Sequence, residues 1–238
     1  MCGRFTVQLT GGEIHELYEV AQPELPMELP LRYNGAPTQE FAACRLDEDG
    51  RRVVTSLRWG LVPSWAKDAG IGARLINARS ETVHEKPSFR SAFRARRCLV
   101  PASGWFEWHG TGRAKKPWFL ALEDGSPLSF AALWERWDRG EERLETFTII
   151  TTEACESLTK IHHRQPAIIP PDRFADWLDP GSPPEQLLEL VREPCAGPFE
   201  KRPVSTRVNR VANDNASILE RVDTTADPGR GVPRLFDL

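Results

Sequence analysis

Long apolar stretches and paired cysteines are both absent from this sequence of 238 residues. No apolar run approaches the roughly 18 residues that a membrane-spanning helix needs, and no apolar segment before Thr10 suggests a secretion signal. Cysteines occur at positions 2, 44, 98, 155 and 195, without a C-x-x-C pair or a nearby histidine. This spacing indicates neither a disulfide framework nor a zinc motif. We therefore expect a protein of the reducing cytoplasm that contacts no membrane.

Tyrosine is scarce, and the net charge is small. Two tyrosines stand against eight tryptophans, which all fall between Trp59 and Trp177 and indicate one aromatic-rich body. The formal net charge is −3, from 31 Lys+Arg against 34 Asp+Glu. As a sum over the whole chain, this charge argues against a general nucleic-acid binder.

The charge is, however, unevenly distributed. Nine basic and three acidic residues lie between Arg58 and Arg97, which gives this segment a net charge of +6, and Trp59 and Trp65 lie within it. Basic side chains beside exposed rings suit a single nucleic-acid strand, because the charges bind phosphates and the rings stack on bases. A solvated charged face is the alternative for part of the segment.

Short apolar segments between Gly- and Asp-containing turns predict a sheet-rich protein. The dipeptide Asp49-Gly50 predicts a hairpin turn. Consecutive strands joined by short turns favour antiparallel pairing and the α+β class. The predicted strands cover residues 2–9, 41–47, 51–59, 98–100, 104–109, 118–122, 128–135 and 144–151.

Helices and loops fill the remaining segments. Thr10 with Glu13 predicts a helix start, and Ser88 is the expected cap of a short helix. Two further helices, each with a proline in its first turn, are predicted over residues 171–178 and 184–192. Residues 21–38 and 60–75 show no hydrophobic period and are predicted as loops. The length suits one domain over residues 1–222, followed by a mobile tail over 223–238.

Cys2 is the first candidate for chemistry. Methionine before so small a residue is commonly removed, and removal of Met1 would leave an α-amine and a thiol on adjacent carbons. Both groups titrate near enough to neutral pH to act as nucleophiles. Such an aminothiol forms an imine with an aldehyde and then closes into a thiazolidine, and it could equally attack an amide. A small buried residue in a first strand is the alternative.

Glu107 lies in the segment Gly104–Trp108, where strand alternation places it on the same face as Trp105. The carboxylate is either an edge residue in water or a group in a partly apolar site. In the second case, desolvation raises its pKa and suits it to general acid–base catalysis.

Adjacent histidines, His162 and His163, offer a proton shuttle. Neighbours in an extended segment point opposite ways, so one of them would face a cleft while the other faces solvent. They therefore make a poor metal pair. A structural histidine is the alternative.

Asn77 and Arg79 form a further polar pair, which follows two apolar residues and precedes a plausible helix start. A turn or a cap is one interpretation of Asn77. The other is an amide that orients a substrate beside an arginine that holds a phosphate.

Eight short motifs occur along the chain. They are Met1–Phe5 (MCGRF), Arg32–Asn34 with Ala36–Thr38, Trp59–Pro63 (WGLVP), Asn77–Thr82 (NARSET), Arg97–Pro101 (RCLVP), Gly104–Trp108 (GWFEW), Thr151–Ala154 (TTEA) and His162 with Arg164–Pro166. In this order they resemble the SOS-response-associated peptidase, or abasic-site-processing, family, from the first residue to about Val211. No single motif is decisive, but eight in order are highly specific.

The resemblance implies sheets curved into a barrel-like core with short helices, and a basic groove for single-stranded DNA. It implies that Cys2 forms a thiazolidine crosslink with the ring-opened aldehyde of an abasic site, with a lyase-like activity beside it. By motif, Asn77 orients Cys2 and the substrate. Glu107 assists ring opening and proton transfer, and His162 acts as a general acid or base. The implied contacts to DNA are Arg4, Asn34, Trp65, Arg79, Thr151 and Arg164.

Two residues beside His162 depart from the family pattern. Gln165 stands where the family usually has methionine, and His163 stands where it often has an acidic or amide residue. Both are expected to tune the rate of the reaction and to leave its type unchanged.

Three functions are open at this point. The first is a crosslinker that shields abasic sites in single-stranded DNA. The second is a thiol peptidase whose Cys2 trims its own leader or another protein, although only Met1 precedes Cys2 here. The third is a DNA-binding module without chemistry. For the first we expect a cytoplasmic, nucleoid-associated monomer that needs no cofactor, with replication-associated proteins open as partners.

Overall fold

Residues 2–20, 30–112, 115–139 and 141–223 are described by the structure, which is a computed structural model. Apart from Asp223, the predicted tail lies outside the described residues. No helix in the described ranges is long and apolar enough to cross a membrane.

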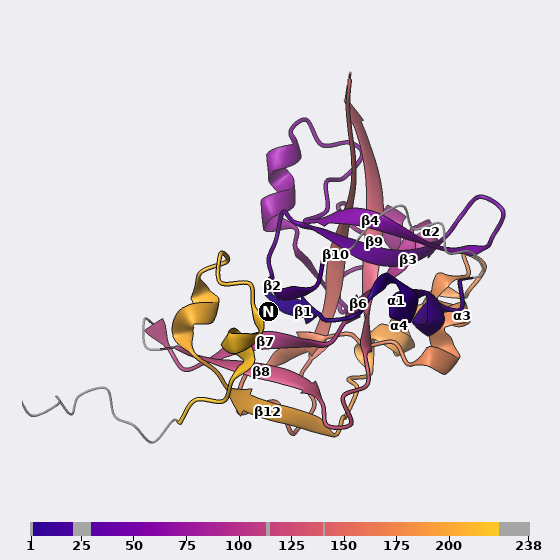
Figure 1. Cartoon of the computed structure of the whole chain (residues 1–238). Helices are drawn as coiled ribbons and strands as arrows, with labels where there is room; N and C mark the ends of the chain where they lie inside the picture. The colour runs from indigo at the N-terminus through magenta and orange to yellow at the C-terminus, as the bar shows by residue number, and fades with distance from the viewer. Residues whose placement is uncertain (1, 21–29, 113–114, 140, 224–238) are drawn as a thin grey trace, which may run out of the picture.

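Five strands close into a barrel, which forms the centre of the fold (Figure 1). The long strand β10 closes the ring, because it pairs with β9 on one side and with β4 on the other. The ring runs through β4 (Arg52–Trp59), β3 (Glu40–Leu46), β6 (Arg97–Ala102), β9 (Leu128–Arg139) and β10 (Glu142–Glu153). The α+β class and the barrel-like core are confirmed.

Pairing in this barrel is mainly antiparallel, as expected, and the parallel pairs all involve one strand. The strand β10 runs parallel to β4 and to the short strand β5 (Asn77–Arg79). Local turns cannot reveal such pairs, because parallel neighbours are joined by long connections. At the end of β10, β11 (Arg164–Pro166) pairs antiparallel.

A second, five-stranded sheet packs against the barrel through aromatic side chains. Phe5 joins the two layers, since its ring centroid lies 5.0 Å from that of Trp59 and 5.8 Å from that of Phe130. This sheet has the order β12 (Phe199–Pro203), β8 (Lys116–Leu122), β7 (Gly104–His109), β1 (Phe5–Val7) and β2 (Arg32–Gly35).

The helices are short and lie outside the sheets (Figure 1). The start predicted at Thr10 is confirmed: its hydroxyl accepts from the Glu13 amide, and the Glu13 carboxylate accepts from the Thr10 amide. The α-helices are α1 (Gly11–Tyr18), α2 (Arg90–Ala95), α3 (Phe174–Leu178) and α4 (Pro184–Arg192). The 3-10 helices are η1 (Ala69–Arg74), η3 (Pro171–Arg173), η4 (Thr206–Asn209) and η5 (Ala216–Leu219).

Four local predictions are wrong. Arg32–Gly35, predicted as loop, is the edge strand β2, which pairs with β1. The predicted loop 60–75 contains η1. The residue before α2 is Phe89, without a side-chain cap, so Ser88 does not cap it. Asn77 begins the strand β5, and no helix starts directly after it.

Candidate active site

Two neighbouring strands of the five-stranded sheet, β1 and β7, bring Cys2 and Glu107 together. Cys2 lies just before β1. The strand β1 pairs with β7, which carries Glu107. The Phe106 amide donates to the Arg4 carbonyl oxygen at 2.9 Å, which fixes this segment against β7 beyond the end of β1. Glu107 thereby comes close enough for its charge to act on the Cys2 thiol.

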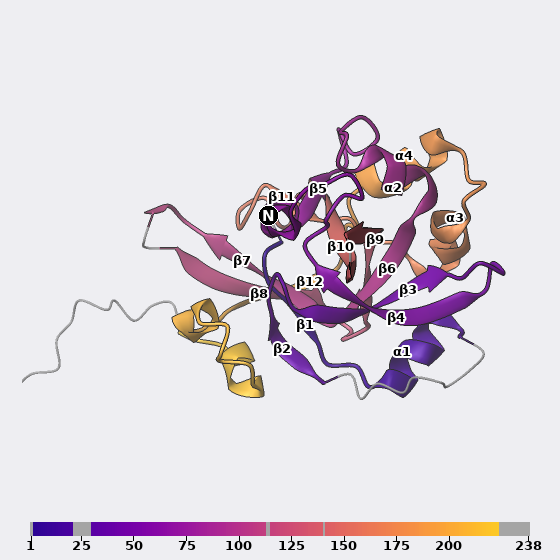
Figure 2. The same ribbon diagram turned by 90° about the horizontal axis from the view of Figure 1, so that it is seen from above.

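The other two predicted catalytic residues arrive on neighbours of β10. Asn77 begins β5, which pairs with β10 at Ile149, and His162 precedes β11, which pairs with the end of β10. Both strands pair with the last residues of β10, and in Figure 2 they lie close together. The four predicted catalytic residues, distant in sequence, therefore gather at one place; they are Cys2, Asn77, Glu107 and His162.

Asn77 holds the backbone of Cys2. Its side-chain amide nitrogen donates to the Cys2 carbonyl oxygen at 2.8 Å. The amide oxygen of Asn77 is buried and has no hydrogen-bond partner among the described residues. A buried acceptor without a partner costs free energy, so this oxygen is placed to receive a hydrogen bond from a bound group.

Cys2 itself is fully buried. Burial raises the pKa of its thiol, and the Glu107 carboxylate raises this pKa further, because both disfavour a thiolate. The thiol form is therefore the stable one in this environment.

Glu107 and His162 form a pair with opposite pKa shifts. Glu107 is 2% exposed, and burial raises its pKa to about 7. Burial lowers the pKa of His162 to about 4. Glu107 Oε2 lies 3.9 Å from His162 Nδ1. At neutral pH the histidine is therefore neutral, and the carboxyl group is poised between its protonated and ionised forms.

The backbone of Arg164 positions the His162 ring. Its amide nitrogen donates to His162 Nδ1 at 3.0 Å, and its carbonyl oxygen lies 3.1 Å from the same ring nitrogen. A neutral ring accepts from the amide, and a ring protonated at Nδ1 donates to the carbonyl. The prediction that His162 and His163 point opposite ways is wrong, because their rings stack with centroids 4.5 Å apart. The segment before β11 is a turn and not an extended strand.

The Arg164 side chain binds other residues of the protein. It is 9% exposed, pairs with both carboxylate oxygens of Glu81, and donates to the Thr151 carbonyl oxygen. Thr151 is buried, and its hydroxyl donates to the Ala78 carbonyl oxygen at 3.5 Å. The DNA contacts expected for Arg164 and Thr151 therefore stay predictions that the burial of both side chains does not favour.

Glu81 is a functional candidate that sequence reasoning missed. Its carboxylate fixes the arginine whose backbone holds His162. Its position inside the Asn77–Thr82 motif was the one sequence feature that pointed to it. Its partner, Arg164, is 83 residues away along the chain. Only the folded structure brings the two together.

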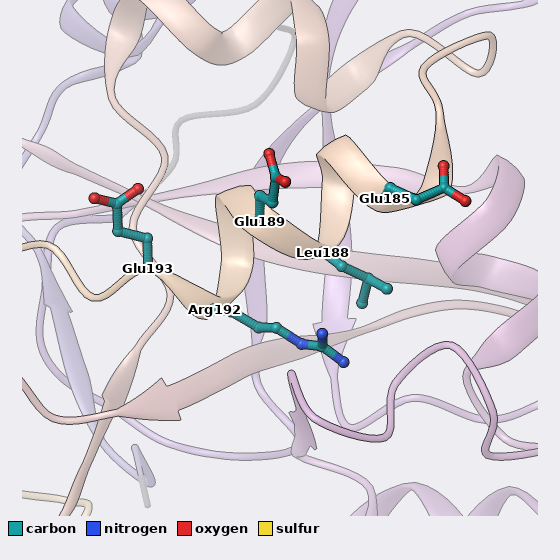
Figure 3. Close-up of a pocket in the computed structure, with 5 residues that line it drawn as sticks. All are labelled: Glu185, Leu188, Glu189, Arg192 and Glu193. Atoms are coloured by element: carbon teal, nitrogen blue, oxygen red, sulfur yellow. The ribbon is translucent and has the colours of Figure 1, made fainter.

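Helix α4, whose pocket residues are drawn in Figure 3, contacts β10 beside this framework. The Arg192 side chain donates to the Glu81 carbonyl oxygen at 3.4 Å, and the Arg192 carbonyl accepts from the Thr152 hydroxyl at 3.0 Å. In Figure 3, Leu188 and Arg192 point to one side of the helix, toward a shallow hollow of about 510 Å³. The helix thus connects the Glu81 loop to β10.

Arg4 and Asn34 act inside the protein. Arg4 donates to Asn34 Oδ1 and to the Val208 carbonyl oxygen, each at 2.7 Å. Asn34 is fully buried, and its amide nitrogen donates to three backbone carbonyls of the segment 208–213. Asn34 therefore holds this segment, and the DNA contact expected for it stays a prediction that its burial does not favour. The contact predicted for Arg4 stays a prediction.

Trp65 and Arg79 are exposed, as contact with a strand requires. Trp65 is 55% exposed and lines a hollow of about 590 Å³ with Lys67 and Arg74. Arg97, at the end of the basic segment, is instead buried and donates to backbone carbonyls of Phe93, Arg94, Trp177 and Asp179. Its charge is therefore not part of a DNA-binding surface.

Metal ligands do not gather in the described part of the chain, where no group of three or more His, Cys, Asp or Glu side chains is arranged to hold an ion. The site consists of the four predicted catalytic residues and the groups that position them.

Comparison with known proteins identifies the family of this chain. The family model of the SOS response associated peptidase (SRAP) matches residues 1–211. The chain belongs to the SRAP family. Within this family, the abasic site processing protein YoaM of Bacillus subtilis is 38% identical over 223 residues, which cover 92% of this chain and 98% of YoaM. YedK of Escherichia coli, also named an abasic site processing protein, is 31% identical, with 93% and 100% covered.

The SRAP fold is also seen in solved structures. A crystal structure of a protein from Bacteroides thetaiotaomicron is similar to this chain with a TM-score of 0.83 and 26% identity. The similarity covers 93% of this chain and all of that one.

Proposed function

We propose that this SRAP protein processes abasic sites, and that it does so by forming a covalent link between Cys2 and an abasic site in single-stranded DNA. The observation that carries the proposal is the gathering of four residues at one place, where two are buried and two are partly exposed; these are Cys2 and Glu107, and Asn77 and His162. The names of the relatives support the substrate, since YoaM and YedK are both called abasic site processing proteins.

The chemistry starts once Met1 is removed, which gives Cys2 a free α-amine. The amine nitrogen attacks the aldehyde carbon of the ring-opened sugar, and a proton from nitrogen passes to the aldehyde oxygen. Loss of that oxygen as water gives an imine. The thiol sulfur then adds to the imine carbon while the thiol proton moves to nitrogen, which closes a thiazolidine ring. One water leaves in total, and no oxidant or reductant is consumed.

Each neighbouring side chain has a role that its environment supports. Asn77 fixes the Cys2 backbone and offers its amide oxygen to the bound group. Glu107, with its pKa at about 7, delivers the proton that water loss needs and assists opening of the sugar ring. His162, with its pKa lowered to about 4, is a neutral base at working pH.

A peptidase activity, which the family description names, is less well supported by these surroundings. Hydrolysis by a cysteine begins with a thiolate, and the raised pKa of the Cys2 thiol disfavours that form. Aldehyde capture begins at the amine instead and needs the thiol only in the second step. The environment of Cys2 therefore favours crosslinking.

A denaturing gel tests the proposal. The protein is incubated with single-stranded DNA that carries one abasic site, and a slow-migrating band that survives denaturation is expected for the wild type and absent for Cys2→Ala. DNA without the abasic site is the matched control. Absence of the band from the wild type at every pH and time would contradict the proposal, and Cys2-dependent cleavage of a peptide would favour the peptidase.

A further inference from the structure

Outside the basic segment 58–97, two exposed arginine side chains make no hydrogen bond or ion pair with the described residues. Arg207 and Arg210 line a surface cavity of about 500 Å³ together with Thr206, Asn209 and Asn213. Within the described residues, neither guanidinium takes part in an ion pair. No acidic residue lines the cavity. The cavity is therefore positively charged and rich in hydrogen-bond donors.

The nearby carboxylate does not neutralise this charge. Asp214 pairs with Arg32 at 3.2 Å and accepts from the amides of Tyr33 and Asn34 at 2.6 and 2.8 Å. Its oxygens are thus directed at β2, which leaves the two cavity arginines available for an anion from outside.

The segment that carries the arginines is held rigidly. Asn34 donates to the carbonyl oxygens of Val208, Arg210 and Asn213 at 3.2, 3.0 and 2.9 Å. The Asn213 amide in turn donates to the Arg207 carbonyl oxygen at 2.7 Å. A binding surface fixed in advance loses little conformational entropy when a ligand arrives.

This segment is also tied to the active site by two separate contacts. Arg4, two positions after Cys2, donates to the Val208 carbonyl oxygen. Trp108, which follows Glu107, donates from its indole nitrogen to Asn209 Oδ1 at 2.9 Å. In both Figure 1 and Figure 2, the segment, coloured yellow, lies beside β2 and β8. An anion in the cavity is therefore held at a fixed position relative to Cys2.

We infer that Arg207 and Arg210 form a phosphate-binding subsite for the DNA strand that carries the abasic site. A guanidinium matches a phosphate group with two parallel hydrogen bonds, and the Thr206 hydroxyl and the Asn209 amide nitrogen add neutral donors. The subsite shares no residue with the hollow at Trp65, so the strand has two separate contact regions. This inference rests on the proposed function, since it takes the same strand as its ligand.

Salt dependence of binding tests the inference. The double variant Arg207→Gln, Arg210→Gln is titrated with fluorescent single-stranded DNA that has no abasic site, at several salt concentrations. The loss of two phosphate contacts should reduce the slope of log K against log salt by about 1.4 and weaken binding at 0.1 M salt by roughly tenfold or more.

A matched variant separates a specific subsite from a general charge effect. Arg51→Gln, Arg143→Gln removes the same charge from side chains that are 72% and 76% exposed on other hairpins. We expect this variant to keep the wild-type slope. An unchanged slope in the Arg207, Arg210 variant, or an equal fall in both variants, would overturn the inference. Failure of the wild type to crosslink would contradict the proposed function instead, because the titration uses DNA without an abasic site.

Discussion

Glu107 shows how burial sets the chemistry of one residue. A glutamate in water is ionised at neutral pH, whereas this carboxyl group is buried between two sheets and has a pKa of about 7. The aromatic residues that flank it in Gly104–Trp108 explain the burial: Trp105 belongs to the main core, and Phe106 to a second cluster on the other face of β7. The alternation predicted for this strand is therefore confirmed.

The raised pKa of Glu107 makes a prediction about stability. The folded protein holds this proton up to about pH 7, whereas an unfolded chain releases it near pH 4.3. Between these values the folded state binds more protons, so the stability that Glu107 contributes is lost as the pH rises. Relative to Glu107→Gln, the wild type should lose about 2–3 kcal/mol of unfolding free energy between pH 5 and pH 8.

Urea unfolding of the two proteins at both pH values measures this difference. Groups that lie away from Glu107 titrate alike in both proteins, so their contributions cancel. A difference that is the same at pH 5 and pH 8 would show that Glu107 is ionised in the fold like an ordinary glutamate. The same variant should crosslink more slowly while it still binds DNA, and equal crosslinking rates would remove Glu107 from the mechanism.

At the scale of elements, the Glu81–Arg164 ion pair connects the turn after β5 to β11. Glu81→Gln keeps the shape of the side chain but removes its charge. We expect the unfolding free energy to fall by about 1 kcal/mol, because this pair is partly exposed. Crosslinking should slow several-fold, because the Arg164 backbone positions His162.

Glu145→Gln is the matched control for this variant. Glu145 also pairs with an arginine through both oxygens, at 3.0 and 2.9 Å, and the pair has similar exposure, but it lies between β3 and β10 of the barrel. We expect a similar loss of stability and an unchanged crosslinking rate, measured at saturating DNA. If both variants lose crosslinking equally, Glu81 has a purely structural role.

Elements with a local signal were predictable from the sequence. The capping box at Thr10 and the turn at Asp49-Gly50 depend on residues within four positions of each other, and Gly50 has the positive φ of 76° that this turn needs. The edge strand Arg32–Gly35 was not predictable, because its pairing with β1 and its anchoring by Asp214 come from distant parts of the chain.

In the candidate site, too, some features were predictable from the sequence and others depend on distant parts of the chain. The motifs identified the four residues that the fold brings together, but the roles of their neighbours depend on partners that are far away in sequence. Asn34 binds the Val208 carbonyl 174 residues away, and Arg164 binds Glu81 83 residues away. The family resemblance implied a DNA contact for both side chains. Residue type cannot decide between that role and an internal one, because arginine and asparagine serve equally well as internal donors.

For the whole molecule, the net charge of −3 conceals separate basic regions. The sequence predicted one such region over residues 58–97, and the fold removes the buried Arg97 from it. The exposed Arg207 and Arg210 add a second region at the other end of the chain. Binding of single-stranded DNA should therefore weaken steeply with added salt despite the negative total charge.

Mass spectrometry of the crosslink tests whether Cys2 joins the abasic site through both its amine and its thiol. After nuclease and trypsin digestion, the peptide Cys2–Arg4 should carry the abasic nucleotide, lack Met1, and have the mass of the two reactants less one water. An adduct on a lysine side chain, or Met1 retained on the crosslinked peptide, would contradict a link through both groups.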